Sequence, residues 1–329
     1  MDITKLEALG LSPEMIRAIQ DTGYEEFTPI QQKAIPVLME GRDIIGQAST
    51  GTGKTAAFGI PAIEMVTDPE ETADPQILVL CPTRELAMQV SDELRKFSKY
   101  KEGLRVVTVY GGQNIDTQIR ALKRAAVVVG TPGRVIDHIR RRTLKLMNIK
   151  LAILDEADEM LDMGFVDDIK QILFNTPENR QTALFSATMP PPIMRLTQRF
   201  LRNPETVKGD EGDTAFNLIQ QYYVEVPKSK KAQGVRLLFE QQGAHRGLIF
   251  CNTKRMVEVL TRELTEMGLA VEGLHGDMAQ GARTRVMAQF KSGETDLLIA
   301  TDVAARGIDA SGVDIIINYD IPQDMEYYV

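Results

Sequence analysis

The stretch LVLCPTRELAMQVSDEL (78–94) returns later in the chain as LIFCNTKRMVEVLTREL (248–264). Cys81 and Cys251 occupy the same place in the two copies, each at the end of an apolar run. Each stretch reads as a strand followed by a helix, because the apolar run gives way to a helical spacing of apolar residues. Similarity at a fixed offset indicates that one structural unit occurs twice in the chain.

Two further blocks support this repeat. VVVGT (127–131) aligns with LLIAT (297–301) at the same offset that separates Cys81 from Cys251. Between the blocks, LRVVTVYGG (104–112) aligns with LAVEGLHGD (269–277) at a slightly shorter offset. Chance similarity between short apolar strands is the competing explanation, but two blocks at one offset favour two copies of one fold.

Short apolar runs alternate with helix-period segments, which predicts an α/β fold of mainly parallel strands in two tandem copies. A polar segment containing glycine and proline predicts a linker at 206–218, between domains at 1–205 and 219–329. A long segment follows Asp155 in the first copy, whereas nine residues follow its counterpart Asp320. The second domain is therefore expected to end at least one strand-and-helix unit early.

Composition limits the class of protein. The chain has 329 residues, of which 43% are hydrophobic and 26% charged, as in ordinary globular domains. No apolar run approaches the ~18 residues that cross a bilayer, and the N-terminus lacks a signal-peptide pattern. We therefore expect a cytoplasmic protein with no membrane partner. In this setting Cys81 and Cys251 are expected to be buried thiols.

The net charge of −8, with an acidic excess in both halves, means that nucleic acid would need a local binding site. One local cluster is basic and is opposed only by Asp137: Arg134, Arg140, Arg141, Arg142, Lys145 and Lys150. A nucleic-acid contact and a solvated helix face explain this cluster equally well.

A phosphate-binding loop follows the strand-like run DIIGQ and precedes the helical segment AAFGIPAIEM. The residues of the loop are Ala48, Ser49, Thr50, Gly51, Thr52, Gly53, Lys54 and Thr55. In such a loop the backbone N–H groups and the helix N-terminus face the phosphates. Lys54 is expected to reach the β- and γ-phosphates, and Thr55 to ligate Mg²⁺.

Acidic residues follow the apolar run LAIL, at 155–158. Asp155 is expected to hold Mg²⁺, and Glu156 to act as the base on the attacking water. The competing explanation is that two solvated acids favour a helix N-terminus. Asp158 is expected to reach the hydroxyls of Ser186 and Thr188, a link that would couple nucleotide state to domain closure. Together with the loop, these acids predict a nucleoside-triphosphate hydrolase.

The chain resembles the DEAD-box ATP-dependent RNA helicases of the prokaryotic type over nearly all of its length. The segments that carry the resemblance occur in one order: GYEEFTPIQ (23–31), ASTGTGKT (48–55), PTRELA (82–87), GG (111–112), TPGR (131–134), DEAD (155–158), SAT (186–188), LIFCNT (248–253), HGDM (275–278) with Gln280 and Arg283, and TDVAARGID (301–309). Each segment alone is a weak match, whereas the ordered set is specific.

This resemblance implies two RecA-like domains of the P-loop, superfamily 2 type, with ATP and Mg²⁺ as cofactors. It implies that Gln31 reads the adenine, Tyr24 stacks on it, and Gly307 and Asp309 approach the nucleotide from the second domain. It also implies a set of RNA-backbone contacts: Arg84, Gly112, Thr131, Arg134, Thr253, Arg283 and Thr301. A packing role for Tyr24 and a surface role for Arg283 are the alternatives.

The resemblance further implies ATP-dependent unwinding of short RNA duplexes by a monomer, through backbone contacts that do not read sequence. In the family an arginine-finger segment follows a tyrosine-valine like Tyr328-Val329. The alternative for this chain is therefore a module that binds ATP, binds RNA weakly and has little or no turnover.

Overall fold

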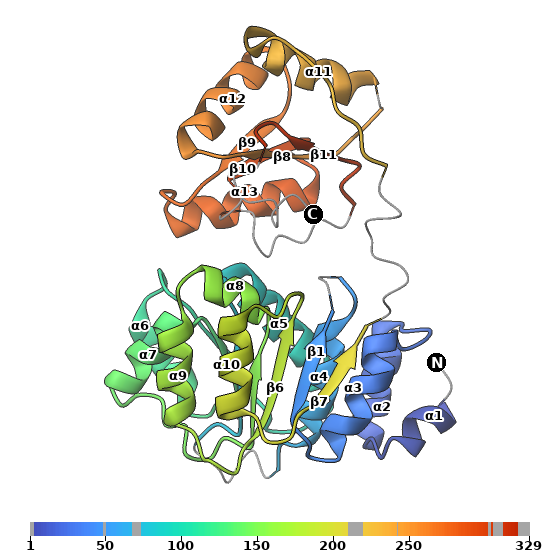
Figure 1. Cartoon of the computed structure of the whole chain (residues 1–329), viewed down its shortest axis with the longest axis vertical. Coiled ribbons are helices and arrows are strands. Elements are labelled where there is room, and N and C mark those ends of the chain that lie inside the picture. Colours follow the sequence, from blue (N-terminus) through green and yellow to red (C-terminus); the bar gives the residue numbers. More distant parts are fainter. Residues whose placement is uncertain are drawn as a thin grey trace. The chain divides into compact units, whose positions relative to one another are not determined.

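The structure is a computed structural model, and it describes residues 3–48, 51–67, 74–209, 220–241, 243–301, 304 and 312–321. It divides into two compact units, Met1–Thr214 and Ala215–Val329 (Figure 1). Each unit is a parallel sheet flanked by helices, as the α/β prediction requires.

Unit 1 contains a seven-stranded sheet with the order β3-β4-β2-β5-β6-β1-β7, in which every pair of neighbours is parallel. Its strands are β1 Ile44–Gln47, β2 Ile77–Leu80, β3 Val106–Val109, β4 Val127–Gly130, β5 Leu151–Leu154, β6 Gln181–Ser186 and β7 Glu205–Lys208. Its helices are α1 Ile3–Ala8, α2 Pro13–Thr22, α3 Pro29–Met39, α4 Lys54–Glu64, α5 Arg84–Phe97, α6 Ile115–Leu122, α7 Pro132–Arg140, α8 Ala157–Asp162, α9 Val166–Phe174 and α10 Pro191–Phe200.

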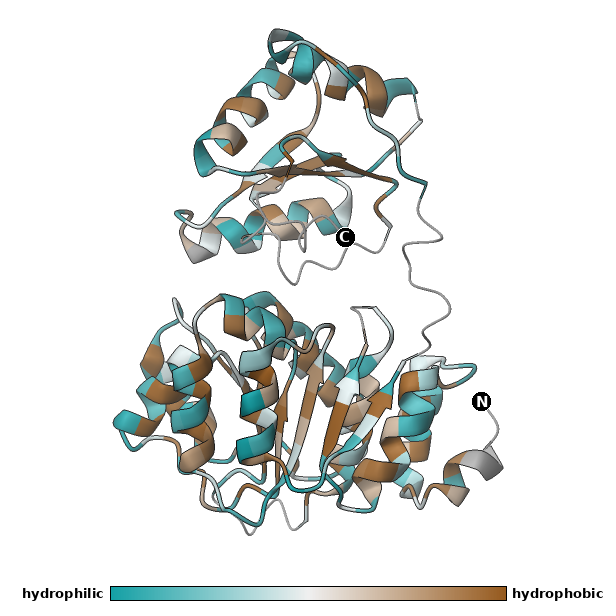
Figure 2. Cartoon of the chain, in the orientation of Figure 1, coloured by the Kyte–Doolittle hydropathy of each residue, from teal (hydrophilic) through white to brown (hydrophobic). Residues whose placement is uncertain are grey.

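Two hydrophobic cores lie on the two faces of this sheet. Ile77 and Val79 of β2 belong to the core under α2 to α5, whereas Leu78 and Leu80 belong to the core under α6 to α10. Successive side chains of a strand point to opposite faces, so a strand covered on both sides must be apolar throughout. Figure 2 shows this as brown strands between helices whose outer faces are teal.

Unit 2 contains a four-stranded parallel sheet with the order β11-β8-β10-β9. Its strands are β8 Gly247–Cys251, β9 Val271–Leu274, β10 Leu297–Thr301 and β11 Ile315–Asn318. Its helices are α11 Lys231–Gln241, preceded by the short 3-10 helix η2 Lys228–Lys230, then α12 Lys254–Glu266 and α13 Gln280–Ser292.

The internal repeat is confirmed down to strand register. The order β3-β4-β2-β5 in unit 1 becomes β9-β10-β8-β11 in unit 2. Ile77 lies opposite Val127 in the first sheet, and Gly247 lies opposite Leu297 in the second, which is the equivalent pair of the repeat. Chance similarity would not reproduce both the order and the register, so the two units are copies of one arrangement.

The helix-start signals of the repeat are also equivalent. The Thr83 hydroxyl accepts a hydrogen bond from the Leu86 N–H at 3.2 Å, and the Thr253 hydroxyl accepts one from the Met256 N–H at 3.2 Å. A threonine at this position therefore starts the helix after the first repeated strand in each unit.

The start of the linker differs from the prediction. Strand β7, Glu205–Lys208, pairs with β1 and belongs to the first sheet, although the sequence suggested that a linker begins at 206. The strand is short and only Val207 is buried in it, so its apolar signal is too weak to read from the sequence.

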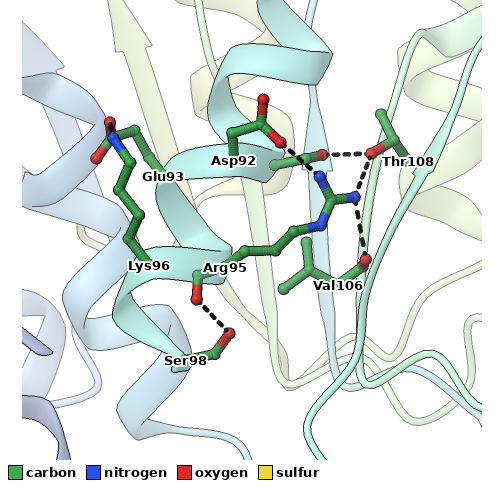
Figure 3. Close-up of polar contacts among 8 residues, drawn as sticks. Asp92, Glu93, Arg95, Lys96, Ser98, Val106 and Thr108 are labelled. Atoms are coloured by element: carbon green, nitrogen blue, oxygen red, sulfur yellow. Dashed lines mark hydrogen bonds and ion pairs between the residues drawn. The ribbon is translucent and has the colours of Figure 1, made fainter. Parts of the chain in front are cut away.

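A charged side chain of α5, Arg95, is hydrogen-bonded to the edge strand β3. Arg95 donates to the Val106 carbonyl at 3.3 Å and to the Thr108 hydroxyl at 3.1 Å, and it pairs with Asp92 at 2.6 Å (Figure 3). A charged side chain over an edge strand opposes pairing with another chain.

Cys81 and Cys251 are buried and not disulfide-bonded, which confirms the prediction of buried thiols. Burial is the main cause that raises the pKa of Cys81 well above its ordinary value. In the part of the chain that the structure describes, no helix is both long and apolar enough to cross a bilayer.

Asp43, just before β1, is hydrogen-bonded to segments that are distant in the sequence. Its removal is expected to destabilise unit 1. Its carboxylate is buried and accepts from the Thr182 N–H at 2.9 Å and the Arg202 N–H at 2.6 Å. Asp43→Ala leaves the buried Thr182 N–H and the partly buried Arg202 N–H without these acceptors, so the free energy of unfolding should fall by about 3 kcal/mol. Urea denaturation measures the loss. Asp167→Ala is the control, because Asp167 is exposed and its ion pair with Lys170 contributes less than about 1 kcal/mol. Equal stability of the two variants would contradict the prediction.

Candidate nucleotide and nucleic-acid site

The phosphate-binding loop connects β1 to α4, as predicted. Gly53 is the N-cap of α4 and has a φ of +88°, a left-handed conformation that favours glycine. Lys54 is the first residue of α4, is buried, and its Nζ has no hydrogen-bond partner among the described residues. A buried ammonium without a partner is costly, so the position fits an anionic ligand. Ser49 and Thr50 lie outside the described residues, whereas Thr55, on the first turn of α4, is half-buried.

The segment at the start of α3 is hydrogen-bonded to this loop. Gln31 donates from Nε2 to the Gly53 carbonyl at 3.0 Å, and its Oε1 accepts from the Thr28 N–H at 2.9 Å. Thr28 in turn donates to the Thr52 carbonyl at 2.8 Å. Two hydrogen bonds, from Gln31 to Gly53 and from Thr28 to Thr52, therefore hold the loop against the start of α3. Tyr24 is half-buried and packs against the core of unit 1.

Sheet order brings the acids to the phosphate loop. Strands β5, β6 and β1 are successive neighbours and parallel, so the residues after each strand emerge at one edge of the sheet. Asp155 follows β5 and is 2% exposed, and Glu156 is 9% exposed. Lys54 is close enough to lower the pKa of both carboxyls.

Burial dominates the titration of these carboxyls. It raises the pKa of Asp155, and burial together with the charge of Asp155 raises the pKa of Glu156 to about 7. Lys54 opposes both shifts but is one positive charge beside two buried carboxyls. The site therefore fits a further cation, and oxygen ligands are those that Mg²⁺ prefers.

Glu156 has a strained backbone. Its φ and ψ are +50° and +56°, a left-handed conformation that costs a non-glycine residue about 1 kcal/mol or more. The strain arises where the chain passes from β5 into α8 with Glu156 as the N-cap. Such outliers cluster at functional sites, which supports a functional role for this carboxyl.

Asp158 contacts the segment after β6. Its Oδ2 accepts from the Thr188 N–H at 2.8 Å, the Thr188 hydroxyl at 3.0 Å and the Ala187 N–H at 3.1 Å. Ser186 behaves differently, because its hydroxyl accepts from the Asp158 N–H at 3.2 Å and donates to the Thr188 carbonyl at 2.7 Å. The expected contact is thus present, but only the Thr188 hydroxyl donates to the carboxylate.

Two arginines flank the turn between β3 and α6. The guanidinium of Arg84 lies against Gly112, where a Cβ would approach it to 2.5 Å, and Gly112 has a φ of +83°. The positive φ disfavours a larger residue at Gly112, whereas the Arg84 guanidinium is the end of a flexible side chain that can shift. Arg134, on α7, donates to the Gln113 carbonyl at 3.2 Å. Thr131 is the N-cap of α7 and is buried. Four predicted RNA contacts of unit 1 therefore lie around one turn and one helix end.

In unit 2 the predicted RNA contacts follow the ends of β8 and β10. Thr253 is exposed at the start of α12, and Thr301 accepts from the Ala304 N–H at 3.4 Å. Arg283 is half-buried and donates to the Ala304 carbonyl at 3.3 Å, so it is more than a solvated surface charge. Gly307 and Asp309 lie outside the described residues.

The basic cluster extends along α7 and beyond its end. Arg134 lies in the first turn of α7 and Arg140 is its last residue, about 9 Å further along the helix axis at 1.5 Å per residue. Arg141 is exposed and pairs with Asp137 at 2.8 Å. The solvated-face interpretation suits this end of the helix.

The sequence interpretation missed Thr28, Gln113, Gln118 and His138. Thr28 precedes Pro29, a helix-start signal that could have identified it as a capping residue. Gln118 aligns with Arg283 when the offset between the blocks 104–112 and 269–277 is extended, and this equivalence could have drawn attention to it. Nothing in the sequence marks Gln113 or His138.

Comparisons with known proteins agree with these features. The DEAD/DEAH box helicase profile matches residues 28–196, and the profile of the helicase conserved C-terminal domain matches residues 229–329. The chain is 52% identical over 328 residues to the DEAD-box ATP-dependent RNA helicase CshA of Geobacillus kaustophilus and 50% identical to the ATP-dependent RNA helicase CshA of Listeria monocytogenes. Both matches include 99% of this chain, but only 70% of the Geobacillus protein and 62% of the Listeria protein.

Solved structures show the same fold. Saccharomyces cerevisiae Dbp5 bound to RNA and ADP–BeF₃ matches with a TM-score of 0.85 and 32% identity, over 97% of this chain and 81% of that one. A DEAD box protein from Methanococcus jannaschii matches with a TM-score of 0.58 and 42% identity, over 97% of this chain and 85% of that one. The prediction of two RecA-like domains is therefore confirmed.

Proposed function

The chain belongs to the DEAD-box helicase family, and from this premise we propose that it is an ATP-dependent RNA helicase, which couples ATP binding and hydrolysis to local unwinding of RNA duplexes. One observation carries the proposal: the buried Nζ of Lys54, which has no hydrogen-bond partner among the described residues, lies at a helix N-terminus beside the buried carboxyls of Asp155 and Glu156. That arrangement suits a triphosphate with a metal ion and an attacking water.

In this proposal Lys54 and the N–H groups of the loop hold the phosphates. Gln31 and Tyr24 take the adenine, and the bond from Gln31 to Gly53 supports this by linking base recognition to the shape of the loop. Glu156 orients and deprotonates water, and its strained backbone and buried carboxyl support this role. Gly307 and Asp309 are proposed to approach the nucleotide from the second domain.

Thr55 and Asp155 are the residues proposed to hold Mg²⁺. A bound ion would supply positive charge against the phosphate oxygens. The excess of buried carboxyls over ammonium groups at the site supports this role. Asp158 fixes the segment at Thr188 through three hydrogen bonds, so it is proposed to transmit nucleotide state to the rest of the molecule.

RNA is proposed to bind through its backbone, along the equivalent strand ends of the two units. The contacts would come from Arg84, Gly112, Thr131 and Arg134 in the first unit and Thr253, Arg283 and Thr301 in the second. The shared caps at Thr83 and Thr253 support this, because two similar edges present similar groups to a repeating phosphate chain. We further propose that the protein acts as a monomer in the cytoplasm on single-stranded and short duplex RNA. We propose that a linker after Lys208 joins its two domains.

The alternative of an ATP-binding module with little turnover is not favoured. About half of the residues are identical to those of relatives named ATP-dependent RNA helicases, over 99% of the chain. The described residues also retain the acids that hydrolysis requires, Asp155 and Glu156.

RNA-stimulated release of phosphate from ATP tests the proposal. Because the chain spans 62% to 70% of the length of these relatives, the assay uses the complete gene product. We expect RNA to raise turnover by at least about tenfold, since ATP and RNA would have to be bound together for hydrolysis. A single-stranded DNA of the same sequence is the matched control. Turnover that does not respond to RNA would contradict the helicase proposal, and equal stimulation by DNA would contradict RNA as the substrate.

A further inference from the structure

We propose that Gln118, on α6, is a positioning residue that holds the guanidinium of Arg134 and the turn at Gly111 and Gly112 in the arrangement that binds RNA. This inference rests on the proposed function, because that function assigns RNA contacts to Arg134 and Gly112. Gln118 itself is 2% exposed and is not proposed to touch RNA.

Gln118 lies at the centre of a hydrogen-bond network. Its Nε2 donates to the Tyr110 carbonyl at 3.0 Å and to the Gln113 Oε1 at 2.9 Å, which ties down both sides of the glycine turn. Its Oε1 accepts from Arg134 Nη1 at 3.2 Å. The same Nη1 also donates to the Gln113 carbonyl at 3.2 Å. One side chain therefore fixes the turn and the arginine together.

A buried histidine fixes which end of the Gln118 amide faces Arg134. His138 is fully buried, and its Nε2 lies 3.0 Å from Gln118 Oε1. The amide oxygen cannot donate, so His138 must donate from Nε2. Its Nδ1 lies 2.8 Å from the Thr143 hydroxyl, which also lies 3.2 Å from the His138 carbonyl. Burial, reinforced by the charge of Arg134, lowers the pKa of His138 and keeps this ring neutral.

With these contacts the Gln118 amide has used both donors and both acceptor positions. A fully satisfied buried network holds one geometry, since any rotation of the amide leaves buried polar groups without partners. Arg134 is thereby positioned before a ligand arrives, and less side-chain entropy is lost when it binds a phosphate.

The internal repeat gives an independent reason to connect the contact between Gln118 and Arg134 with RNA. Position 118 corresponds to Arg283 at the offset of the blocks 104–112 and 269–277, and position 134 corresponds to Ala304 at the offset of the blocks 127–131 and 297–301. In unit 2, Arg283 contacts the Ala304 carbonyl, just as Gln118 contacts Arg134 in unit 1. Each unit thus places one guanidinium within this equivalent pair of positions, that of Arg134 on α7 in the first copy and that of Arg283 on α13 in the second. Helix α6, the counterpart of α13, carries the neutral Gln118, which supports the arginine of α7.

A double-mutant cycle on the complete chain tests the inference. The variants are Gln118→Met, Arg134→Ala and their combination, and binding of a labelled single-stranded polyuridine RNA is measured by fluorescence anisotropy with Mg²⁺ and a nonhydrolysable ATP analogue. We expect Arg134→Ala to weaken RNA binding about tenfold and Gln118→Met to weaken it by a similar factor. In the double variant the Gln118 change should add less than about twofold, because both act through one guanidinium.

Salt dependence separates positioning from a merely structural effect. Each single variant should reduce the slope of log affinity against log salt by about 0.7, the value for one phosphate contact on a single strand. Affinity for the ATP analogue without RNA should stay within about twofold. If Gln118→Met does not fold, Gln118→Glu keeps the shape of the side chain, and its carboxylate should neutralise Arg134 and produce the same loss of slope.

Gln181→Met is the matched control. Gln181 is a buried glutamine whose amide donates to the carbonyls of Leu38 and Arg42, so its loss should lower the melting temperature without changing RNA affinity. The inference is overturned if Gln118→Met lowers only the melting temperature, or if its effect on RNA affinity is the same in the Arg134→Ala background. An Arg134→Ala variant that binds RNA normally would overturn both the inference and the proposed RNA contact.

Discussion

Glu156→Gln is expected to abolish ATP hydrolysis while the protein continues to bind ATP. The amide keeps the shape of the side chain but cannot accept a proton from water, and a positioned base contributes about 10²–10⁴ in rate. RNA-stimulated turnover should therefore fall at least about 100-fold. The dissociation constant for ATP should stay within about threefold, because the carboxyl is proposed to act on water and not on the phosphates. Turnover is measured by phosphate release and affinity with a fluorescent ATP analogue.

Glu159→Gln is the matched control for this variant. Glu159 lies on the same helix α8, and its charge also raises the pKa of Glu156. The same chemical change at this position should leave turnover within about threefold, because Glu159 is not proposed to meet the water. If Glu156→Gln hydrolyses ATP at the normal rate, the base is a different group. If both variants lose turnover, the local charge and not the base would be the important property.

Lys54→Ala is expected to weaken ATP binding about 100-fold, which corresponds to about 2.7 kcal/mol. In the free protein the buried Nζ has no hydrogen-bond partner among the described residues, so a phosphate would supply its first strong partner. The pKa values of Asp155 and Glu156 would rise without the Lys54 charge that lowers them, so these carboxyls would take up protons more readily and offset a small part of the loss. Titration with the same fluorescent ATP analogue measures the loss.

Lys150→Ala serves as the control for Lys54. Its Nζ donates to the Thr67 hydroxyl at 2.6 Å, near the start of β5 and so at the opposite end of the strand from Asp155. ATP affinity should not change in this variant, and thermal unfolding should show that both variants are folded. Normal ATP affinity in Lys54→Ala would place the triphosphate elsewhere and would remove the observation on which the proposed function rests.

Much of the fold was readable from the sequence because its signals are local. Apolar runs such as 77–80 are buried strands since both faces of the sheet are covered. The ends of α2 carry local signals of the same kind. Ser12 caps α2 by accepting from the Met15 N–H at 3.3 Å, and Gly23 ends α2 with a φ of +76°. The repeat extended this local reading to strand order, because equivalent segments form equivalent pairs.

The candidate site was only partly readable. The loop residues and the acids follow strands directly, so sheet topology alone places Lys54 and Asp155 at one edge. The partners of Gln31 could not be foreseen, because its bond to Gly53 joins residues 22 positions apart through the packing of α3 on α4. The same holds for His138, whose orientation depends on Gln118, a residue 20 positions earlier on another helix.

The sequence by itself determined the class of fold, its duplication and the identity of the chemical groups at the site, because strand and helix periods and loop motifs are properties of neighbouring residues. Only the tertiary structure decided which polar groups are buried and with whom they bond. It showed that Lys54 is buried without a hydrogen-bond partner among the described residues, that Asp158 is hydrogen-bonded to Thr188, and that Gln118 is hydrogen-bonded to Arg134. The physical reason is that desolvation and hydrogen bonding depend on distances across packed elements, and a linear order of residues does not contain those distances.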